Sequence, residues 1–108
     1  MRYLPLILLL SCGSPSNDPA PIALPQVKTF AESTPHGVIV KCIIISGTGI
    51  AHKGYCWKDG YPYPPTLSDN ATEKLIDTLQ LGPGRYFFRA FAQNGAGIAY
   101  GDTIIIEL

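Results

Sequence analysis

Short apolar runs that alternate with polar residues, separated by turn-forming residues, fill the chain from residue 26 to residue 108. In a strand, successive side chains point to opposite faces, so a period of two predicts β-strands with one buried face. Strands at this spacing are typical of an all-β, two-sheet antiparallel sandwich. The runs fall near residues 26–31, 37–46, 50–57, 73–81, 84–94 and 97–107.

The segment from residue 70 to residue 82 has a second interpretation. Asn70 or Thr72 could cap a short helix whose apolar face is formed by the leucines and the isoleucine that follow. Gly82 and Pro83 would then end that helix. Strand and helix both remain open for this segment.

Catalytic and metal-binding patterns are weak in this chain. His36 follows a proline in a turn, and His52 precedes Cys56 by four residues, a spacing that separates ligands by about 13 Å on a strand. The chain has neither a pair of Cys-x-x-Cys units nor a His-Glu-x-x-His or Gly-x-Ser-x-Gly motif. We therefore expect neither an enzyme, a metal site nor a cofactor.

The first twelve residues, MRYLPLILLLSC, resemble the signal peptide of a bacterial lipoprotein. Arg2 supplies a positive leading charge, the apolar run of residues 4–10 is too short to span a bilayer, and a small residue precedes Cys12. The resemblance implies that residues 1–11 are removed and that Cys12 carries lipid, with the outer membrane favoured. Periplasmic and external faces both remain open.

Residues 12–25 are rich in Pro, Ser and Gly, which predicts an extended tether between the lipid and a single domain at residues 26–108. That domain is long enough for one small core. Without residues 1–11 the chain has 7 basic and 8 acidic residues. This balance does not favour nucleic acid as a partner, because nucleic-acid binders usually carry a basic stripe.

The second half of the chain contains short motifs in a recurring order: Gly54, Cys56 and Trp57; Pro65 and Thr66; Leu81 and Pro83; Tyr86, Arg89 and Ala90; and Asn94, Ala96, Gly97, Ala99, Tyr100 and Gly101. In combination these motifs resemble the fibronectin type III-like modules of bacterial surface and secreted proteins. The resemblance implies an immunoglobulin-like sandwich and a spacer, adhesive or binding role, without an activity. It also implies a tyrosine corner, in which the hydroxyl of Tyr86 bonds to the preceding turn.

Alternation also predicts apolar residues on the outer faces of two strands. Counted from an inward Tyr86, Phe87 and Phe91 point outward and are expected to be exposed. Counted from an outward Lys41, Ile43 points outward too. Such residues mark either a surface for a partner or an area covered by a neighbouring strand or the tether.

Cys42 and Cys56 remain after Cys12 is assigned to lipidation. If Lys41 and Lys53 face solvent, both cysteines face the core, where they could form a disulfide or remain two buried thiols. The same count turns Trp57 outward, although a sandwich tryptophan on this strand is often buried. A β-bulge nearby could turn Trp57 inward instead.

The loop DGYPYPPT is the best candidate for recognition. Tyr61 and Tyr63 alternate with prolines, which lower the entropy cost of presenting their rings. We expect a cell-envelope lipoprotein whose sandwich binds a protein partner or acts as a structural module. The alternative is a surface lipoprotein that presents these tyrosines to polysaccharide.

Overall fold

The computed structural model describes residues 21–60 and 63–108. The signal peptide, Cys12 and most of the tether, together with Tyr61, lie outside these residues. No helix in the described ranges is long and apolar enough to cross a membrane. Seven strands occupy the described part of the chain: β1 (Gln26–Thr34), β2 (Gly37–Ser46), β3 (His52–Asp59), β4 (Asn70–Thr72), β5 (Ile76–Leu79), β6 (Arg85–Asn94) and β7 (Gly97–Glu107).

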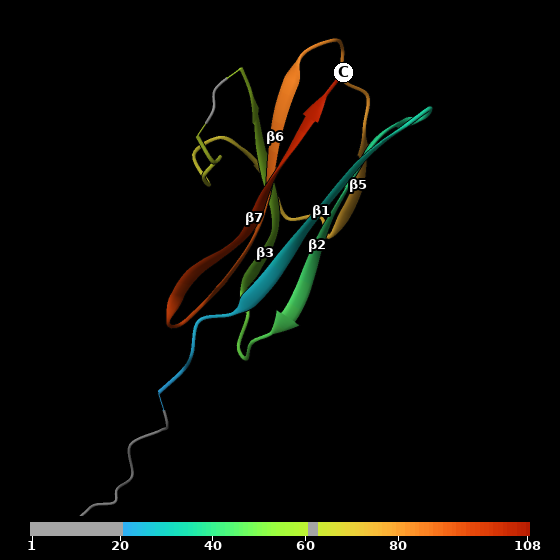
Figure 1. Cartoon of the computed structure of the whole chain (residues 1–108). Coiled ribbons are helices and arrows are strands. Elements are labelled where there is room, and N and C mark those ends of the chain that lie inside the picture. The colour runs from blue at the N-terminus through green and yellow to red at the C-terminus, as the bar shows by residue number, and fades with distance from the viewer. Residues whose placement is uncertain (1–20, 61–62) are drawn as a thin grey trace, which may run out of the picture.

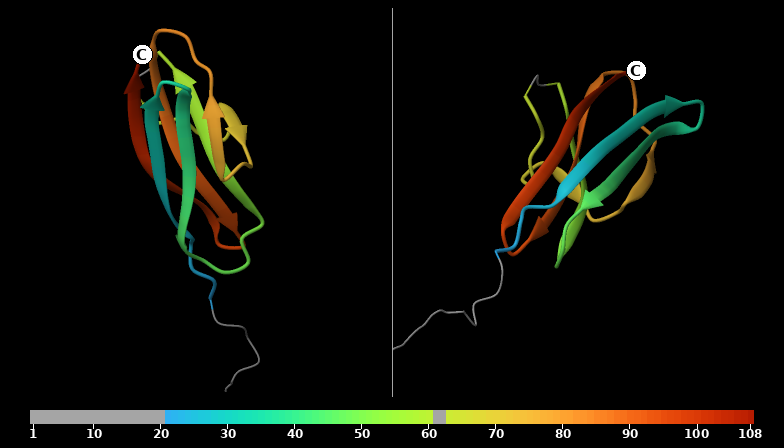
Figure 2. Two further views of the ribbon diagram at one scale, coloured as in Figure 1. Left: turned by 90° about the vertical axis from the view of Figure 1, so that its right-hand side faces the viewer. Right: turned by 60° about the horizontal axis from the view of Figure 1, so that its bottom comes forward.

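The strands form two antiparallel sheets that enclose one core, as in a β-sandwich (Figures 1 and 2). One sheet has the order β1-β2-β5 and the other the order β4-β3-β6-β7. The prediction of an all-β fold with two antiparallel sheets is confirmed. The helix alternative for residues 70–82 is wrong, because this segment contains β4 and β5.

The predicted strand at 73–81 is the element that the structure changes most. It is shortened to β5, and β4 precedes it in the other sheet. Residues 73–75 carry the chain between the sheets and pass over Gly54, where an added Cβ would collide with the carbonyl oxygen of Thr72. The segment can therefore cross here only because position 54 has no side chain.

The core lies between the sheets and joins aliphatic residues of β2 to aromatic residues of β3 and β6. Its buried members are Val38, Val40, Tyr55, Tyr86 and Phe88. Trp57 packs against them, with its ring centroid 6.0 Å from that of Tyr86 and 6.3 Å from that of Phe88. These tilted contacts are the geometries that aromatic pairs prefer.

The tyrosine corner implied by the sequence is present. The hydroxyl of Tyr86 donates a hydrogen bond of 2.8 Å to the carbonyl oxygen of Gly82, four residues upstream. Because Tyr86 is also part of the core, this bond attaches the β5–β6 connection to the interior.

Thr29 joins the two sheets at the side where β1 lies beside β7. The register of β6 with β7 shifts between Arg89 and Phe91, and such a shift leaves a residue of the ladder unpaired. The N–H of Ala90 donates instead to the buried hydroxyl of Thr29, at 2.9 Å. Gly101 permits this approach, because an added Cβ would lie 2.7 Å from the Thr29 hydroxyl oxygen.

Replacing Thr29 tests this link between the sheets. Thr29→Val keeps the shape of the side chain but leaves the buried N–H of Ala90 without its acceptor, so we expect a loss of about 1–3 kcal/mol in the free energy of unfolding. Thr29→Ser keeps the hydroxyl and loses one methyl group, so it should cost less. Urea denaturation of both variants measures the difference, and equal stabilities of the two variants would contradict the role of this bond.

Candidate functional site

Tyr63 lies in the loop that follows β3, with 56% of its surface exposed. The ammonium nitrogen of Lys58 lies 3.9 Å from the centre of its ring and also 3.9 Å from a carboxylate oxygen of Asp69. Tyr61, the other predicted tyrosine of this loop, lies outside the described residues. The structure therefore places one exposed aromatic ring beside a cation in this loop.

Arg89 fixes the loop to the four-stranded sheet. One terminal nitrogen of its guanidinium donates a hydrogen bond of 3.2 Å to the carbonyl oxygen of Pro65, which is buried. The guanidinium carbon lies 4.0 Å from the centre of the Tyr100 ring, a cation–π arrangement. The loop beyond Tyr63 is thus anchored to the sheet surface.

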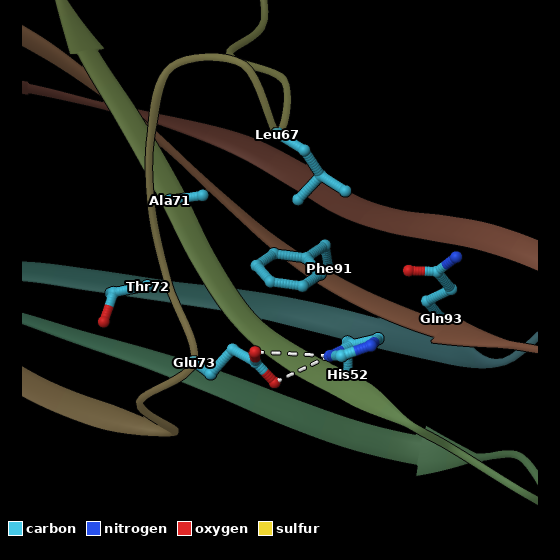
Figure 3. Close-up of a pocket in the computed structure, with 7 residues that line it drawn as sticks. All are labelled: His52, Leu67, Ala71, Thr72, Glu73, Phe91 and Gln93. Atoms are coloured by element: carbon cyan, nitrogen blue, oxygen red, sulfur yellow. Dashed lines mark hydrogen bonds and ion pairs between the residues drawn. The ribbon is translucent and has the colours of Figure 1, made fainter.

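Phe87 and Phe91 are buried, with exposed fractions of 2% and 3%, so the prediction that they are exposed is wrong. The prediction of which face they occupy is correct, because Phe88 lies in the core and Phe87 and Phe91 lie on the opposite face of the sheet. The chain from Pro65 onward returns across this face and brings Leu67 close to Phe91 (Figure 3). Neither phenylalanine is therefore available to a partner in this conformation.

A hollow of about 520 Å³ opens on this outer face of the four-stranded sheet (Figure 3). A nitrogen of the His52 ring, Nδ1, lies 3.2 Å from both carboxylate oxygens of Glu73. No local sequence pattern indicates this pair, because the two residues are 21 positions apart and meet only when residues 73–75 cross between the sheets. Apolar and polar side chains line the hollow: Leu67, Ala71 and Phe91, and His52, Glu73 and Gln93.

The polar side chains of the hollow can donate and accept hydrogen bonds, but they do not form a metal site or an activated nucleophile. His52 and Glu73 provide two potential metal ligands, and the described residues contain no group of three or more His, Cys, Asp or Glu side chains placed to hold an ion. Thr72 lies on the far side of Glu73 from His52, so its hydroxyl is not positioned for activation by the imidazole (Figure 3).

The outer face of the three-stranded sheet carries exposed isoleucines, as the alternation in residues 37–46 predicts. Ile43 and Ile45 of β2 are 41% and 61% exposed, and Ile76 of β5 is 60% exposed. The ammonium nitrogen of Lys41 lies 5.0 Å from the centre of the Phe30 ring on the same face. This face therefore leaves several large apolar side chains in contact with solvent.

Cys42 and Cys56 are free thiols, so the disulfide alternative is wrong. Cys42 shares the inward face of β2 with Val40, whereas Cys56 is opposite Arg89 on the outer side of the four-stranded sheet. Trp57 consequently faces the core. The prediction for β3 was wrong because it took Lys53 as an outward-facing residue. Lys53 lies near the exposed start of β3, where a side chain that faces inward still reaches solvent.

Both thiols are held in their protonated form. Burial raises the pKa of Cys42, and it raises the pKa of Cys56 to about 11 despite the nearby charge of Arg89. Cys42 donates to the carbonyl oxygen of Phe91 at 3.5 Å, and Cys56 donates to that of Arg89 at 3.4 Å. Thiols in this state are poor nucleophiles and act here as small buried side chains.

Tyr55 and Asp77 form a second polar link between the sheets. The phenol donates a hydrogen bond of 2.6 Å to the carboxylate, from β3 to β5. Burial, followed by this bond, raises the pKa of Tyr55. The same bond lowers the pKa of Asp77, with a smaller contribution from Lys74, whose nitrogen lies 3.7 Å from the carboxylate.

Comparison of the chain with models of known protein families found no match, nor did comparisons with curated proteins and with solved structures.

The link between Tyr55 and Asp77 makes the stability of the domain depend on pH. Because folding lowers the pKa of Asp77 from its ordinary value of 3.8, the stabilisation is present above that pH and is lost as the pH falls through the lower value of the folded state. We expect Asp77→Asn to remove part of the fall in unfolding free energy on acidification below pH 3.8.

Denaturant unfolding at a series of pH values between neutral and strongly acidic measures this dependence. Asp59→Asn is the matched control, because Asp59 is exposed at the end of β3 and should leave the dependence unchanged. An Asp77→Asn variant with the pH dependence of the unmodified protein would contradict the assignment.

Proposed function

We propose that the chain is a cell-envelope lipoprotein, anchored by lipid on Cys12, whose sandwich is a non-enzymatic module that binds a protein partner. The outer membrane is the favoured location, and the domain is of the fibronectin type III-like kind. Two sheets of three and four antiparallel strands and the bond from Tyr86 to Gly82 support that domain type.

The observation that carries the proposal is the position of Tyr63 relative to the tether. At one end of β6, Asn94 donates hydrogen bonds to the carbonyl oxygens of Ala23 at 2.8 Å and Thr48 at 3.1 Å. At the other end, Arg85 accepts a hydrogen bond from Gly60, in the turn that leads to Tyr63. Ten strand residues separate these ends by about 30 Å.

This arrangement suits an anchored protein that presents a loop away from its attachment. The chain enters the domain at the end where β2 stops, whereas the loop after β3 begins at the opposite end (Figure 1). An exposed tyrosine next to a lysine is a frequent contact in protein recognition, because the ring is large, rigid and partly polar. We infer that the Tyr63 loop meets the partner.

Polysaccharide is the second candidate for the same loop. It is favoured by the 56% exposure of the Tyr63 ring, since sugars also bind to exposed aromatic rings. The two candidates differ in a simple property, because a glycan ligand should bind the purified protein without any second protein.

Co-purification tests both the anchor and the loop. After mild solubilisation of membranes, the native chain is expected to co-purify with a partner, and Cys12→Ala should move the protein from the membrane fraction to the soluble fraction. Tyr63→Ala should lose the partner but stay in the membrane. His36→Ala is the control, because it changes an exposed ring in a different turn, between β1 and β2.

Three outcomes would contradict the proposal. A Cys12→Ala variant that remains in the membrane would exclude the lipid anchor. A partner that Tyr63→Ala retains would exclude the loop. Binding of the purified native protein to a glycan panel, lost in Tyr63→Ala, would replace the protein partner by polysaccharide.

A further inference from the structure

The outer face of the three-stranded sheet carries exposed apolar side chains that the proposed function does not use. Ile43, Ile45 and Ile76 are each more than one-third exposed on this face. β5 pairs only with residues 38–41 of β2, so the half of β2 that contains Ile43 and Ile45 has a strand on one side only. Such a surface usually contacts another molecule.

Basic residues surround these isoleucines. Lys28 is directly opposite Ile43 in the register of β1 and β2, and Lys41 is directly opposite Ile76 in the register of β2 and β5. Lys74, at the start of the crossing to β5, has a side chain that is 64% exposed. Lysine and isoleucine therefore alternate across the face.

The acidic groups near this face are fewer and differently placed. Glu32 is opposite Ile39, toward the end of β1 that is farther from the tether. The carboxylate of Asp77 is bonded to Tyr55 in the other sheet and lies 3.7 Å from Lys74. The half of the face nearer to the tether consequently has a positive character.

The tether enters beside the same half of the face. Gln26, the first residue of β1, pairs with Ser46, the residue after Ile45. The two apolar side chains just before β1, Ile22 and Leu24, are 53% and 51% exposed. Both side chains lie beside the β6–β7 turn, near Gly95 and Gly97, so they flank the entry of the tether and are not part of the face of β2.

We propose that this face, defined by Lys28, Lys41, Ile43, Ile45 and Ile76, docks onto a membrane surface that contains anionic lipids. The proposal rests on the lipid anchor proposed above, which keeps the face close to the bilayer at a high effective concentration. Lysines held near an anionic bilayer are attracted to it, and exposed isoleucines gain free energy by leaving water at the same contact.

A lipid surface explains the face better than an acidic protein partner does. The isoleucines and lysines lie at the end where the tether enters, whereas the Tyr63 loop begins at the opposite end of β6 and on the outer side of the other sheet. Docking of this face on the bilayer would leave that loop pointing away from the membrane. Docking of the three-stranded face and exposure of the Tyr63 loop are therefore compatible with a single orientation of the anchored protein.

The experiment measures how deeply two positions enter the bilayer. Ile45→Cys and Ile105→Cys each add one thiol at an isoleucine of similar exposure, 61% and 54%, on different sheets. Cys42 and Cys56 are buried, so an environment-sensitive dye labels the added thiol in the folded, full-length lipidated protein. The labelled proteins are reconstituted in vesicles of phosphatidylcholine, with or without phosphatidylglycerol, that contain brominated lipids as quenchers.

We expect the dye at position 45 to be quenched in vesicles that contain phosphatidylglycerol and the dye at position 105 to remain unquenched. Quenching should weaken when salt is raised, because exposed charges are then screened. Lys28→Ala, introduced together with the dye at position 45, should lower the ratio of docked to undocked protein by about fivefold.

Failure of the docking and failure of the anchor give different results. If the protein stays on the vesicles while the dye at position 45 behaves like the dye at position 105, the docking is wrong and the anchor stands. If the purified protein lacks the mass of a lipid and leaves the membrane fraction, the anchor is wrong. A dye at position 45 that responds only when membrane proteins are added would overturn the lipid surface in favour of a protein partner.

Discussion

The hydrogen bond from the N–H of Ala90 to the hydroxyl of Thr29 is the contact on which the arrangement of the two sheets depends. Because the register of β6 and β7 shifts at this point, this N–H does not bond to β7. Thr29 of β1, in the other sheet, supplies its acceptor. Cys42, opposite Thr29 in β2, donates to the carbonyl oxygen of the next residue of β6. Because burying an unpaired N–H is costly, these bonds favour one position of β1 against β6. They thereby fix where the tether enters.

Much of the fold follows from local pattern, whereas the contacts of the outer faces do not. The bounds of β2 and β7 agree with the alternation, and the tyrosine corner agrees with the resemblance on which it was predicted. Exposure of Phe91 was predicted wrongly, because alternation tells which face a residue occupies but not what later returns to cover that face. That cover comes from the long loop after β3, whose proline-rich sequence gives no indication of where it packs.

In β3, the choice of reference residue decided which side chains were predicted to face the core. The count from Lys53 turned Cys56 inward and Trp57 outward, but a lysine near the start of a strand can reach solvent from either face. The burial of Trp57 would have been the better reference, since a large aromatic side chain gains more from the core than a lysine loses at its edge. Likewise, the link between Tyr55 and Asp77 depends on a strand crossing that local sequence does not reveal.

The outer faces of the two sheets differ in how their apolar side chains are covered. Both sheets carry apolar side chains on the side away from the core, as Phe91 does on β6 and Ile43 does on β2. On the four-stranded sheet the chain covers Phe91 with its own loop, which is attached by Arg89 and Pro65. On the three-stranded sheet the described residues provide no such cover, and β5 is too short to shield the end of β2. These exposed isoleucines lie next to the point where the tether enters β1, on the side from which the proposed lipid anchor would hold the domain.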